Sequence, residues 1–312
     1  MQRRILITGA AGYIGSQLAR QLSENHAVFG VDIRPDETAD FPFFKMDIRD
    51  PKLAQLVQEH EIQQVVHLAA VLEDSGDRAR DYDIDVNGTR NVLEACVACG
   101  ISQVVVASSG AAYGYHADNP EWLDEKDALR GNPEFAYSDH KRQVEEMLAE
   151  YRQRHPELKQ LVLRPGTVLG AETRNLITRL FEGDRMLAVA GSPSPFVFIW
   201  DQDVVAIIEQ GVCRDSSGCF NLAGDGALSI HALGKLLGKP VITVPAPLIK
   251  AGLWVGNKLG LTGYVPAQVN FLRYRPVLNN RRLKEEFGYT PRKNSEQVFR
   301  FFMDAARARH QL

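Results

Sequence analysis

Short apolar runs alternate with amphipathic segments over the first 170 residues of the chain. The runs are rich in Val, Ile and Leu and lack a polar residue at every second position, which is typical of strands buried on both faces. The predicted strands are residues 4–8, 27–32, 43–46, 63–70, 103–109 and 160–165. Between them, apolar residues recur at helical spacing, most clearly over residues 13–23, 83–100 and 137–154. This alternation predicts an α/β protein with a Rossmann-type, doubly wound parallel sheet.

The pattern loosens after about residue 170. Residues 195–200 and 241–245 are predicted strands, and residues 204–212 are a predicted helix that returns to the core. We therefore expect a nucleotide-binding core over 1–170 and a smaller, mixed substrate-binding lobe over 171–312, with segments that return to the core.

One apolar stretch in the second half, Leu248 to Leu261, is interrupted by Lys250 and Lys258. It is too short to span a bilayer, so it is predicted to be a buried or lid helix.

Charge and cysteine content narrow the class of protein. The formal net charge of −3 offers no basic field for nucleic acid, so neither a nucleic-acid nor a membrane partner is expected. Cys96 and Cys99 fall within a predicted helix and are expected to pack it rather than to bind a metal. We expect a cytoplasmic protein, because the four cysteines are expected to be reduced and no secretory signal is found.

A glycine-rich turn joins the first predicted strand to the first predicted helix. Gly9, Gly12 and Gly15 allow a tight turn and a close approach of the backbone to a diphosphate at the helix N-terminus. Asp32 ends the second strand about 20 residues later, as a dinucleotide-binding fingerprint requires. A carboxylate there accepts hydrogen bonds from ribose hydroxyls and repels a 2′-phosphate, which favours NAD over NADP. Arg34, two positions on, could instead reach a phosphate.

Tyr137 and Lys141 stand four residues apart at the start of a predicted helix, so they share one helix face. A free phenol has a pKa of about 10, so it needs a nearby cation to act as a base near neutral pH. The pair therefore predicts a general base. A buried Tyr and a surface Lys would be the structural alternative, and His67 and His140 are expected to be structural.

Further motifs are MDIRD at 46–50, HLAA at 67–70, ASSGAAYG at 107–114, YSDHK at 137–141 and LRPGTVLG at 163–170. With the glycine turn, they resemble the extended short-chain dehydrogenase/reductases. This group includes the NAD-dependent sugar epimerases and dehydratases and the 3β-hydroxysteroid dehydrogenase type. The resemblance implies NAD as cofactor. The cofactor-binding residues that it implies are Gly9, Gly12, Tyr13, Ile14, Gly15, Asp32, Asp47, Ile48, Leu68, Ala69, Ala70, Asn87, Tyr137, Lys141, Pro165 and Val168.

The resemblance also implies a catalytic set of Ser109, Tyr137 and Lys141. Tyr137 would take the proton of a substrate hydroxyl, Lys141 would support it and bind the nicotinamide ribose, and Ser109 would hold the reacting oxygen. Asn87 falls where the family has a helix Asn that organises an active-site water. We expect hydride transfer at a secondary alcohol or ketone carbon of a small-molecule substrate.

Several departures from the family pattern bear on the substrate. Gly110 and Ala111 replace the Asp-Glu of dehydratases, which disfavours dehydration. Phe196 stands where sugar-nucleotide epimerases carry an Arg, and residues 166–168 lack their Asn. Arginines that could still meet phosphates are Arg174, Arg179, Arg273 and Arg275. Aromatic residues that suggest either a partly apolar pocket or core packing are Phe196, Phe198, Trp200 and Trp254.

Two alternatives to a dehydrogenase remain open on the sequence. A sugar-nucleotide 4-epimerase would use the same residues with tightly bound NAD, and a non-catalytic NAD-sensing protein would keep the fold alone. The resemblance also implies a homodimer through the helices near residues 81–99 and 137–154.

Overall fold

Seven parallel strands form the central sheet in the order β10-β6-β5-β4-β1-β2-β3. In the computed structural model, residues 2–193, 195–260 and 266–309 are described. The strands are β1 (Arg4–Thr8), β2 (Ala27–Asp32), β3 (Phe43–Lys45), β4 (Gln64–His67), β5 (Gln103–Ala107), β6 (Lys159–Pro165) and β10 (Gly218–Leu222). The order reverses between β1 and β4, where doubly wound sheets bind their ligands. The predicted parallel Rossmann-type sheet is confirmed, and β10 adds a seventh strand from the second half of the chain.

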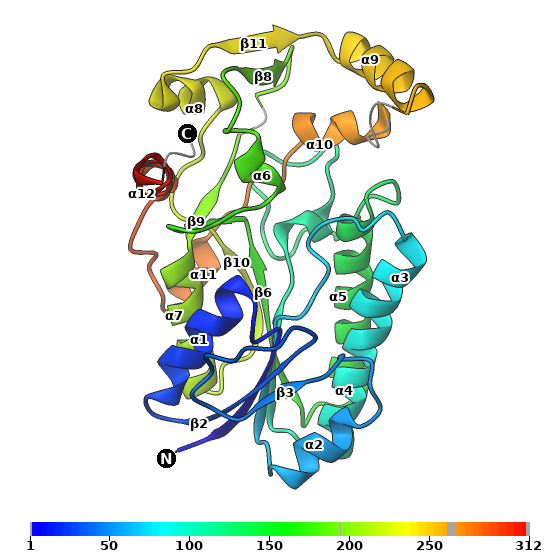
Figure 1. Ribbon diagram of the computed structural model, residues 1–312, viewed down its shortest axis with the longest axis vertical. Coiled ribbons are helices and arrows are strands. Elements are labelled where there is room, and N and C mark those ends of the chain that lie inside the picture. Colours follow the sequence, from blue (N-terminus) through cyan, green and yellow to red (C-terminus); the bar gives the residue numbers. More distant parts are fainter. Residues whose placement is uncertain (1, 194, 261–265, 310–312) are drawn as a thin grey trace.

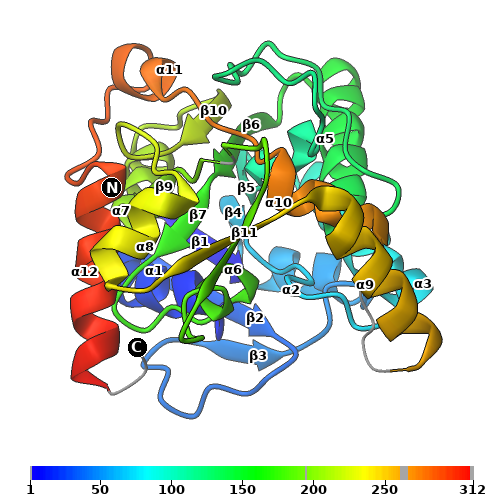
Figure 2. The same ribbon diagram turned by 90° about the horizontal axis from the view of Figure 1, so that it is seen from above.

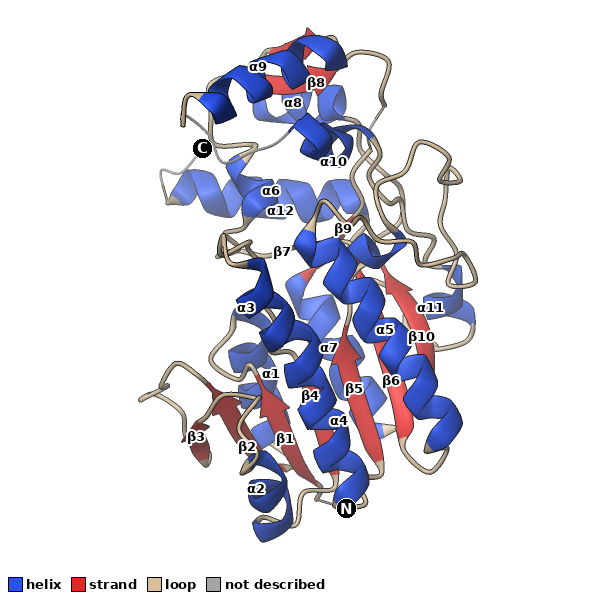
Figure 3. Ribbon diagram, turned by 90° about the vertical axis from the view of Figure 1, so that its right-hand side faces the viewer, coloured by secondary structure: helices blue, strands red, loops and turns tan. Residues whose placement is uncertain are grey.

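Helices cover both faces of this sheet (Figure 3). α2 (Leu53–Glu59), α4 (Gly88–Ala98) and α5 (Ala136–Arg154) lie on one face, and α1 (Tyr13–Ser23) and α7 (Asp201–Cys213) lie on the other. Adjacent residues of β5 show why the strands are apolar throughout. Val104 packs in the cluster formed with the first set of helices, and Val105 packs in the cluster formed with the second.

Beyond the carboxyl ends of the strands lies a second part of the molecule (Figure 1). It contains two small parallel sheets, in which β7 (Thr167–Leu169) pairs with β9 (Phe198–Trp200) and β8 (Met186–Val189) pairs with β11 (Val241–Val244). α8 (Ile230–Leu237) and α12 (Ser295–Ala308) pack with them around an aromatic cluster. Short helices complete the fold: α3 (Arg78–Tyr82), η1 (Asp83–Asn87), η2 (Gly110–Tyr113), α6 (Leu176–Arg179), η3 (Pro266–Gln268), α10 (Val269–Arg273) and α11 (Arg281–Glu285).

α9 (Ala246–Lys258) bears on one prediction. The stretch from Leu248 onward was expected to be a buried or lid helix, and the buried alternative is wrong, because Ala246 is the buried residue of α9 and Leu248 is 63% exposed. The lid role stays a prediction. α9 lies along an outer edge of the molecule (Figure 2), because its neighbours cover one of its faces only. Leu261 lies outside the described residues.

Cys96 packs in the core on α4, as predicted, and the four cysteines are free thiols. Within the described ranges, no group of three or more His, Cys, Asp or Glu side chains is placed to hold a metal ion. No helix in the described part of the chain is long and apolar enough to cross a membrane.

Candidate functional site

The glycine turn after β1 requires glycine at two of its positions. Gly9 has a φ of +74°, and a Cβ there would lie 2.7 Å from the backbone nitrogen of Ala69. A Cβ on Gly15 would lie 2.1 Å from the carbonyl oxygen of Gly9. The turn is therefore tight because two backbones approach each other with no room for a side chain.

The same turn presents the start of α1. Gly12 is the N-cap of α1, and the first turn of this helix contains no acidic residue. The backbone N–H groups of Tyr13, Ile14 and Gly15 lie at this helix N-terminus, where a helix attracts anions. The Tyr13 side chain turns elsewhere, since its hydroxyl donates to Asp201 at 2.6 Å. Burial, followed by this hydrogen bond, raises the pKa of Tyr13 to about 12.

Asp32 lies beside the turn with its carboxylate held in place. One oxygen accepts a hydrogen bond from the Ala11 N–H at 3.1 Å, and the other accepts from the Arg34 N–H at 2.9 Å. The Arg34 guanidinium donates to the Ala11 carbonyl at 3.1 Å. The structure thus puts Asp32 where the fingerprint requires a ribose-binding carboxylate.

Asp47 and Ile48 follow β3, whose Lys45 is in register with Asp32. Asp47 pairs with Arg49 at 2.7 Å, and the hydrogen bond from Arg49 lowers the pKa of Asp47. Ile48 is 5% exposed, and its side chain packs in the core. Asp47 is therefore the more accessible of the two.

The remaining predicted cofactor segments also follow strands at this edge of the sheet. Leu68, Ala69 and Ala70 come directly after β4, and Ala69 N–H donates to the Thr8 hydroxyl at 3.5 Å. Pro165 ends β6, and Val168 pairs with Ile199 in the small sheet just beyond. The segments from β1, β4 and β6 thus meet at the carboxyl ends of the strands.

Asn87 is the predicted site residue that the structure does not bring to this group. Its side chain is exposed, and its amide donates to Asp83 at 2.8 Å. Asp85, two positions earlier, is buried instead, and it accepts a hydrogen bond from the Val71 N–H at 2.8 Å. Both residues lie in the π-helical turn η1, a local irregularity that the apolar spacing could not reveal.

Tyr137, Lys141 and Ser109 come together where β5 ends and α5 begins. The Lys141 ammonium donates to the carbonyl oxygen of Ala107, the last residue of β5, at 2.9 Å. It stands 5.8 Å from the centre of the Tyr137 ring.

Ser109 caps η2 on the other side of this junction. Its hydroxyl accepts a hydrogen bond from Ala111 N–H at 3.1 Å, and the Ala111 carbonyl accepts one from Ser138 of α5 at 2.6 Å. Because Ser138 follows Tyr137 directly, this contact fixes the Ser109 turn against the first turn of α5. A hydroxyl, a phenol and an ammonium are thus placed at one strand end.

Burial and a nearby charge keep His67 neutral beneath this junction. The ring contacts the Thr8 hydroxyl at 2.7 Å and the Thr89 hydroxyl at 3.0 Å, and it is 3% exposed. Burial, with a smaller effect from the Lys141 ammonium, lowers the pKa of His67 to about 3. His67 therefore links β1, β4 and α4, in line with the structural role predicted for it.

A buried ionic network beside Ser109 was missed in the sequence. Arg164 pairs with Glu145 at 2.6 Å and donates to the Tyr113 hydroxyl at 2.8 Å. The Ser108 hydroxyl donates to Glu145, so the network ties α5 to the ends of β5 and β6. Arg164 inside an apolar strand was the available signal, because a buried guanidinium requires a partner.

Three aromatic rings pack together beside Tyr137. The ring centre of Phe271 lies 4.8 Å from that of Tyr115 and 5.3 Å from that of Phe135. The ring centres of Phe135 and Tyr137 are 6.2 Å apart. Burial raises the pKa of the Tyr115 phenol. These three residues form an apolar wall that the sequence did not point to.

The aromatic residues singled out in the sequence lie elsewhere. Phe196 and Phe198 stack in the core cluster, and Trp254 is 54% exposed on α9. Trp200 packs against Phe301. The Arg275 guanidinium lies 3.8 Å from the centre of the Phe196 ring, and burial lowers its pKa to about 10, so it stays charged at neutral pH.

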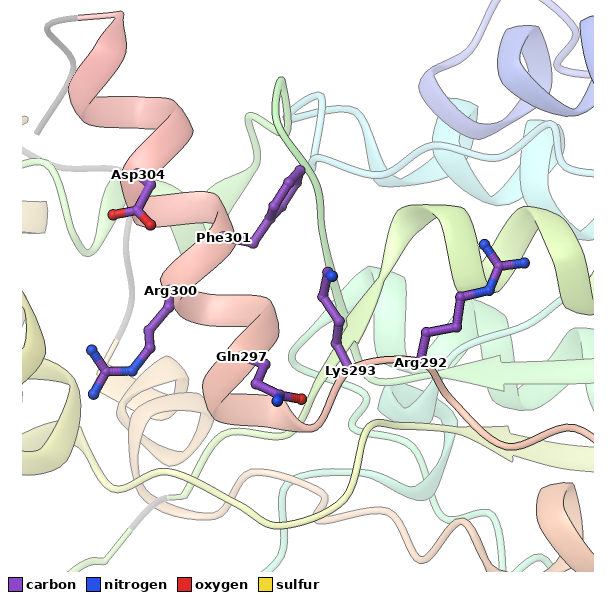
Figure 4. Close-up of a pocket in the computed structure, with 6 residues that line it drawn as sticks. All are labelled: Arg292, Lys293, Gln297, Arg300, Phe301 and Asp304. Carbon is purple, nitrogen blue, oxygen red and sulfur yellow. The ribbon is translucent and has the colours of Figure 1, made fainter.

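A surface pocket of about 330 Å³ lies along α12 (Figure 4). It is lined by Arg292, Lys293, Gln297, Arg300, Phe301 and Asp304. No predicted site residue lines this pocket, so it is separate from the strand ends described above.

Comparison with known proteins agrees with this geometry. The model of the NAD dependent epimerase/dehydratase family matches residues 5–192. The chain belongs to this family. Its cofactor is NAD, and it is an NAD-dependent enzyme of the extended short-chain dehydrogenase/reductase type. The glycine turn and Asp32 fit the dinucleotide, because the turn leaves backbone N–H groups at the start of α1 for a diphosphate and the Asp32 carboxylate lies beside the turn for a ribose.

Three proteins similar to this chain are named for two different activities. A UDP-glucose 4-epimerase of Neisseria gonorrhoeae is 30% identical over 190 residues, covering 55% of each chain. A decarboxylating sterol-4-alpha-carboxylate 3-dehydrogenase of Saccharomyces cerevisiae is 25% identical, covering 94% of this chain and 95% of that one. The solved structure of a Thermotoga maritima UDP-glucose 4-epimerase with UDP-glucose has a TM-score of 0.77 at 21% identity, covering 98% and 99% of the two chains.

Proposed function

We propose that the protein transfers a hydride between NAD and a secondary alcohol or ketone carbon, with Ser109, Tyr137 and Lys141 as its catalytic residues. The observation that carries the proposal is the junction of β5 and α5. There the Lys141 ammonium is bound to the end of the strand one helical turn from Tyr137. Membership of an NAD-dependent family supports the same chemistry.

In the oxidation direction, the substrate loses a proton from its hydroxyl and a hydride from its carbon. NAD, when bound, is the hydride acceptor. Tyr137 takes the proton on its phenolate oxygen, and the Lys141 ammonium stabilises that phenolate beforehand. The Ser109 hydroxyl holds the reacting oxygen as the carbonyl forms. The reverse sequence, with a proton returned by Tyr137, reduces a ketone.

Residues at the strand ends would hold the cofactor. In this proposal the diphosphate lies on the N–H groups of Tyr13, Ile14 and Gly15, and Asp32 binds the adenosine ribose. We also propose that residues 171–312 supply the substrate side, while β10 and α7 of that half complete the core.

The wall of Tyr115, Phe135 and Phe271 favours a substrate with an apolar body next to the reacting carbon. A 3-dehydrogenase that acts on a sterol carboxylate is among the similar proteins. A UDP-sugar 4-epimerase is the second candidate, and Arg275 favours it. Its charged guanidinium lies against Phe196 and Phe271, on the same side as the wall, where it could bind a substrate phosphate.

Product analysis with NAD separates the two candidates. The purified protein is incubated with NAD and hydroxysteroid-type alcohols, or with UDP-glucose, and NADH absorbance and sugar products are followed. A dehydrogenase produces NADH in proportion to the alcohol consumed. An epimerase converts UDP-glucose to its 4-epimer without net NADH. An NAD-loaded protein that is inert toward both panels would contradict the proposal and leave a non-catalytic NAD-binding role.

We further propose a cytoplasmic homodimer that pairs through α4 and α5. Static light scattering of the purified chain tests the oligomeric state, and a monomer at micromolar concentration would contradict it.

A further inference from the structure

We propose that the outer face of α9, with the exposed face of the neighbouring β8–β11 sheet, docks on the surface of an anionic lipid bilayer. This inference differs from the sequence-based expectation of no membrane partner. It goes beyond the proposed chemistry and does not depend on it.

The outer face of α9 is apolar and exposed. Leu248, Val255 and Leu259, the residue after α9, are 63%, 47% and 66% exposed. They are spaced by seven and four residues, so they form one stripe along the helix. The opposite face, with Ile249 and Leu253, packs on the protein. α9 is therefore apolar on both faces, and its neighbours cover just one of them.

The sheet beside α9 also exposes apolar side chains. Leu187 of β8 is paired in register with Ile242 of β11, and the two side chains are 45% and 42% exposed. Met186 and Ala188, which point to the other face of the same strand, pack in the core cluster with α8. Figure 1 shows β8, β11 and α9 together at the end of the molecule farthest from the N-terminus.

The charge of this region is one-sided. Residues 226–260, which contain α8, β11 and α9, include four Lys residues and no Asp or Glu, although the whole chain carries a net charge of −3. Two of these basic residues, Lys250 and Lys258, are on α9, and the Lys258 ammonium lies 4.2 Å from the centre of the Trp254 ring. Lys258 and Trp254 lie beside the apolar stripe, an arrangement typical of helices that lie in a membrane interface. Basic residues near such a stripe complement anionic lipid headgroups.

The same observations argue against a membrane-spanning α9 and against a second copy of the chain on this face. α9 has 13 residues and is roughly 20 Å long, so it lies on a bilayer and does not span its hydrocarbon core of about 30 Å. A second copy of the chain would bring this face against itself and would place the Lys258 charges of both copies in one interface.

The docking face is continuous with the apolar wall beside Tyr137. Leu253 of α9 packs in one cluster with Val269 and Leu272 of α10, and α10 carries Phe271. Docking would therefore place the bilayer against α9, which packs on the helix that carries Phe271. This arrangement suits an apolar substrate that enters from the lipid.

Vesicle sedimentation with the full chain tests the proposal. The protein is mixed with phosphatidylcholine vesicles, with or without phosphatidylserine, at low and physiological salt. We expect binding to the vesicles that contain phosphatidylserine, weaker binding to phosphatidylcholine alone, and weakening by salt. No sedimentation with anionic vesicles at low salt would overturn the proposal.

Two double variants separate the apolar and charged parts. Lys250→Gln with Lys258→Gln is expected to weaken binding to anionic vesicles roughly 10- to 30-fold and to leave binding to neutral vesicles unchanged. Leu248→Ser with Trp254→Ser is expected to weaken binding to both by at least about tenfold. Trp122→Ser, at another exposed tryptophan, is the matched control and should bind as the wild type does.

Circular dichroism and NAD affinity confirm that each variant is folded. Wild-type binding by both double variants, or equal loss in the Trp122 control, contradicts the proposal. Light scattering tests whether a second copy of the chain covers this face. If the wild type forms a larger species that the Leu248 and Trp254 changes abolish, a second copy of the chain covers this face, and the lipid proposal is wrong.

Discussion

His140 Nδ1 lies 3.0 Å from a carboxylate oxygen of Asp85, and the two residues are 1% and 4% exposed. Asp85 belongs to η1, and His140 belongs to α5, directly before Lys141. The other oxygen of Asp85 accepts a hydrogen bond from the Val71 N–H, just after the HLAA segment. One buried pair thus joins a predicted cofactor segment to the helix that carries the predicted base.

Asp85→Ala is expected to lower the free energy of unfolding by about 2–4 kcal/mol, because it leaves His140 buried without its partner and removes the acceptor of the Val71 N–H. It should also reduce kcat by shifting α5 against the cofactor segment. Urea denaturation and steady-state kinetics measure the two effects. Asp83→Ala is the matched control on the same turn, and its half-exposed pair with Arg49 should cost below about 1 kcal/mol. Equal costs for the two variants would contradict the role of the buried pair.

Tyr137→Phe is expected to reduce kcat by roughly 10²- to 10⁴-fold, since the ring remains and the proton acceptor is removed. NAD affinity should stay within about twofold of wild type, because Lys141 remains bound to the Ala107 carbonyl. Steady-state kinetics measure kcat, and calorimetric titration measures the affinity for NAD. Wild-type turnover by this variant would rule out Tyr137 as the base.

Asp32→Ala is expected to weaken NAD binding roughly 10- to 100-fold, because it removes a carboxylate that the Ala11 and Arg34 N–H groups hold in position to bind the ribose. The same change should raise the affinity for NADP, since Arg34 is then free of the carboxylate and can bind a 2′-phosphate. Calorimetry with both dinucleotides measures the switch. Asp36→Ala, at an exposed carboxylate four residues on, serves as the control.

Stability should fall as the pH drops below about 6.5, with His67 as one cause. Its folded pKa is lowered to about 3, so between pH 6.5 and 3 the unfolded chain binds a proton that the folded chain excludes. The stabilisation is therefore complete above pH 6.5 and is lost as the pH falls toward 3. The slope from this residue is at most about 1.4 kcal/mol per pH unit.

His67→Asn should flatten that part of the curve, whereas His231→Asn, at an exposed histidine, should leave it unchanged. Denaturation series at several pH values provide the comparison. Parallel curves for the wild type and the His67 variant would show that other groups dominate the acid side.

Several features of this protein follow from local rules and could be predicted from the order of its residues. Strand–turn–helix order, the glycines at positions 9 and 15, and Asp32 at the end of β2 follow from residue type and short spacing. The i, i+4 relation of Tyr137 and Lys141 follows from the helix period alone. Six of the seven strands of the central sheet were predictable for the same reason.

Which distant side chains meet depends on the packing of the folded chain. Asp85 and His140 are 55 positions apart, and the π-helical turn buries Asp85 while it exposes Asn87. Tyr115, Phe135 and Phe271 form a wall from three separate segments. β10 pairs with β6, and α9 keeps one apolar face at the surface, because burial depends on which elements pack together rather than on hydrophobicity along the chain.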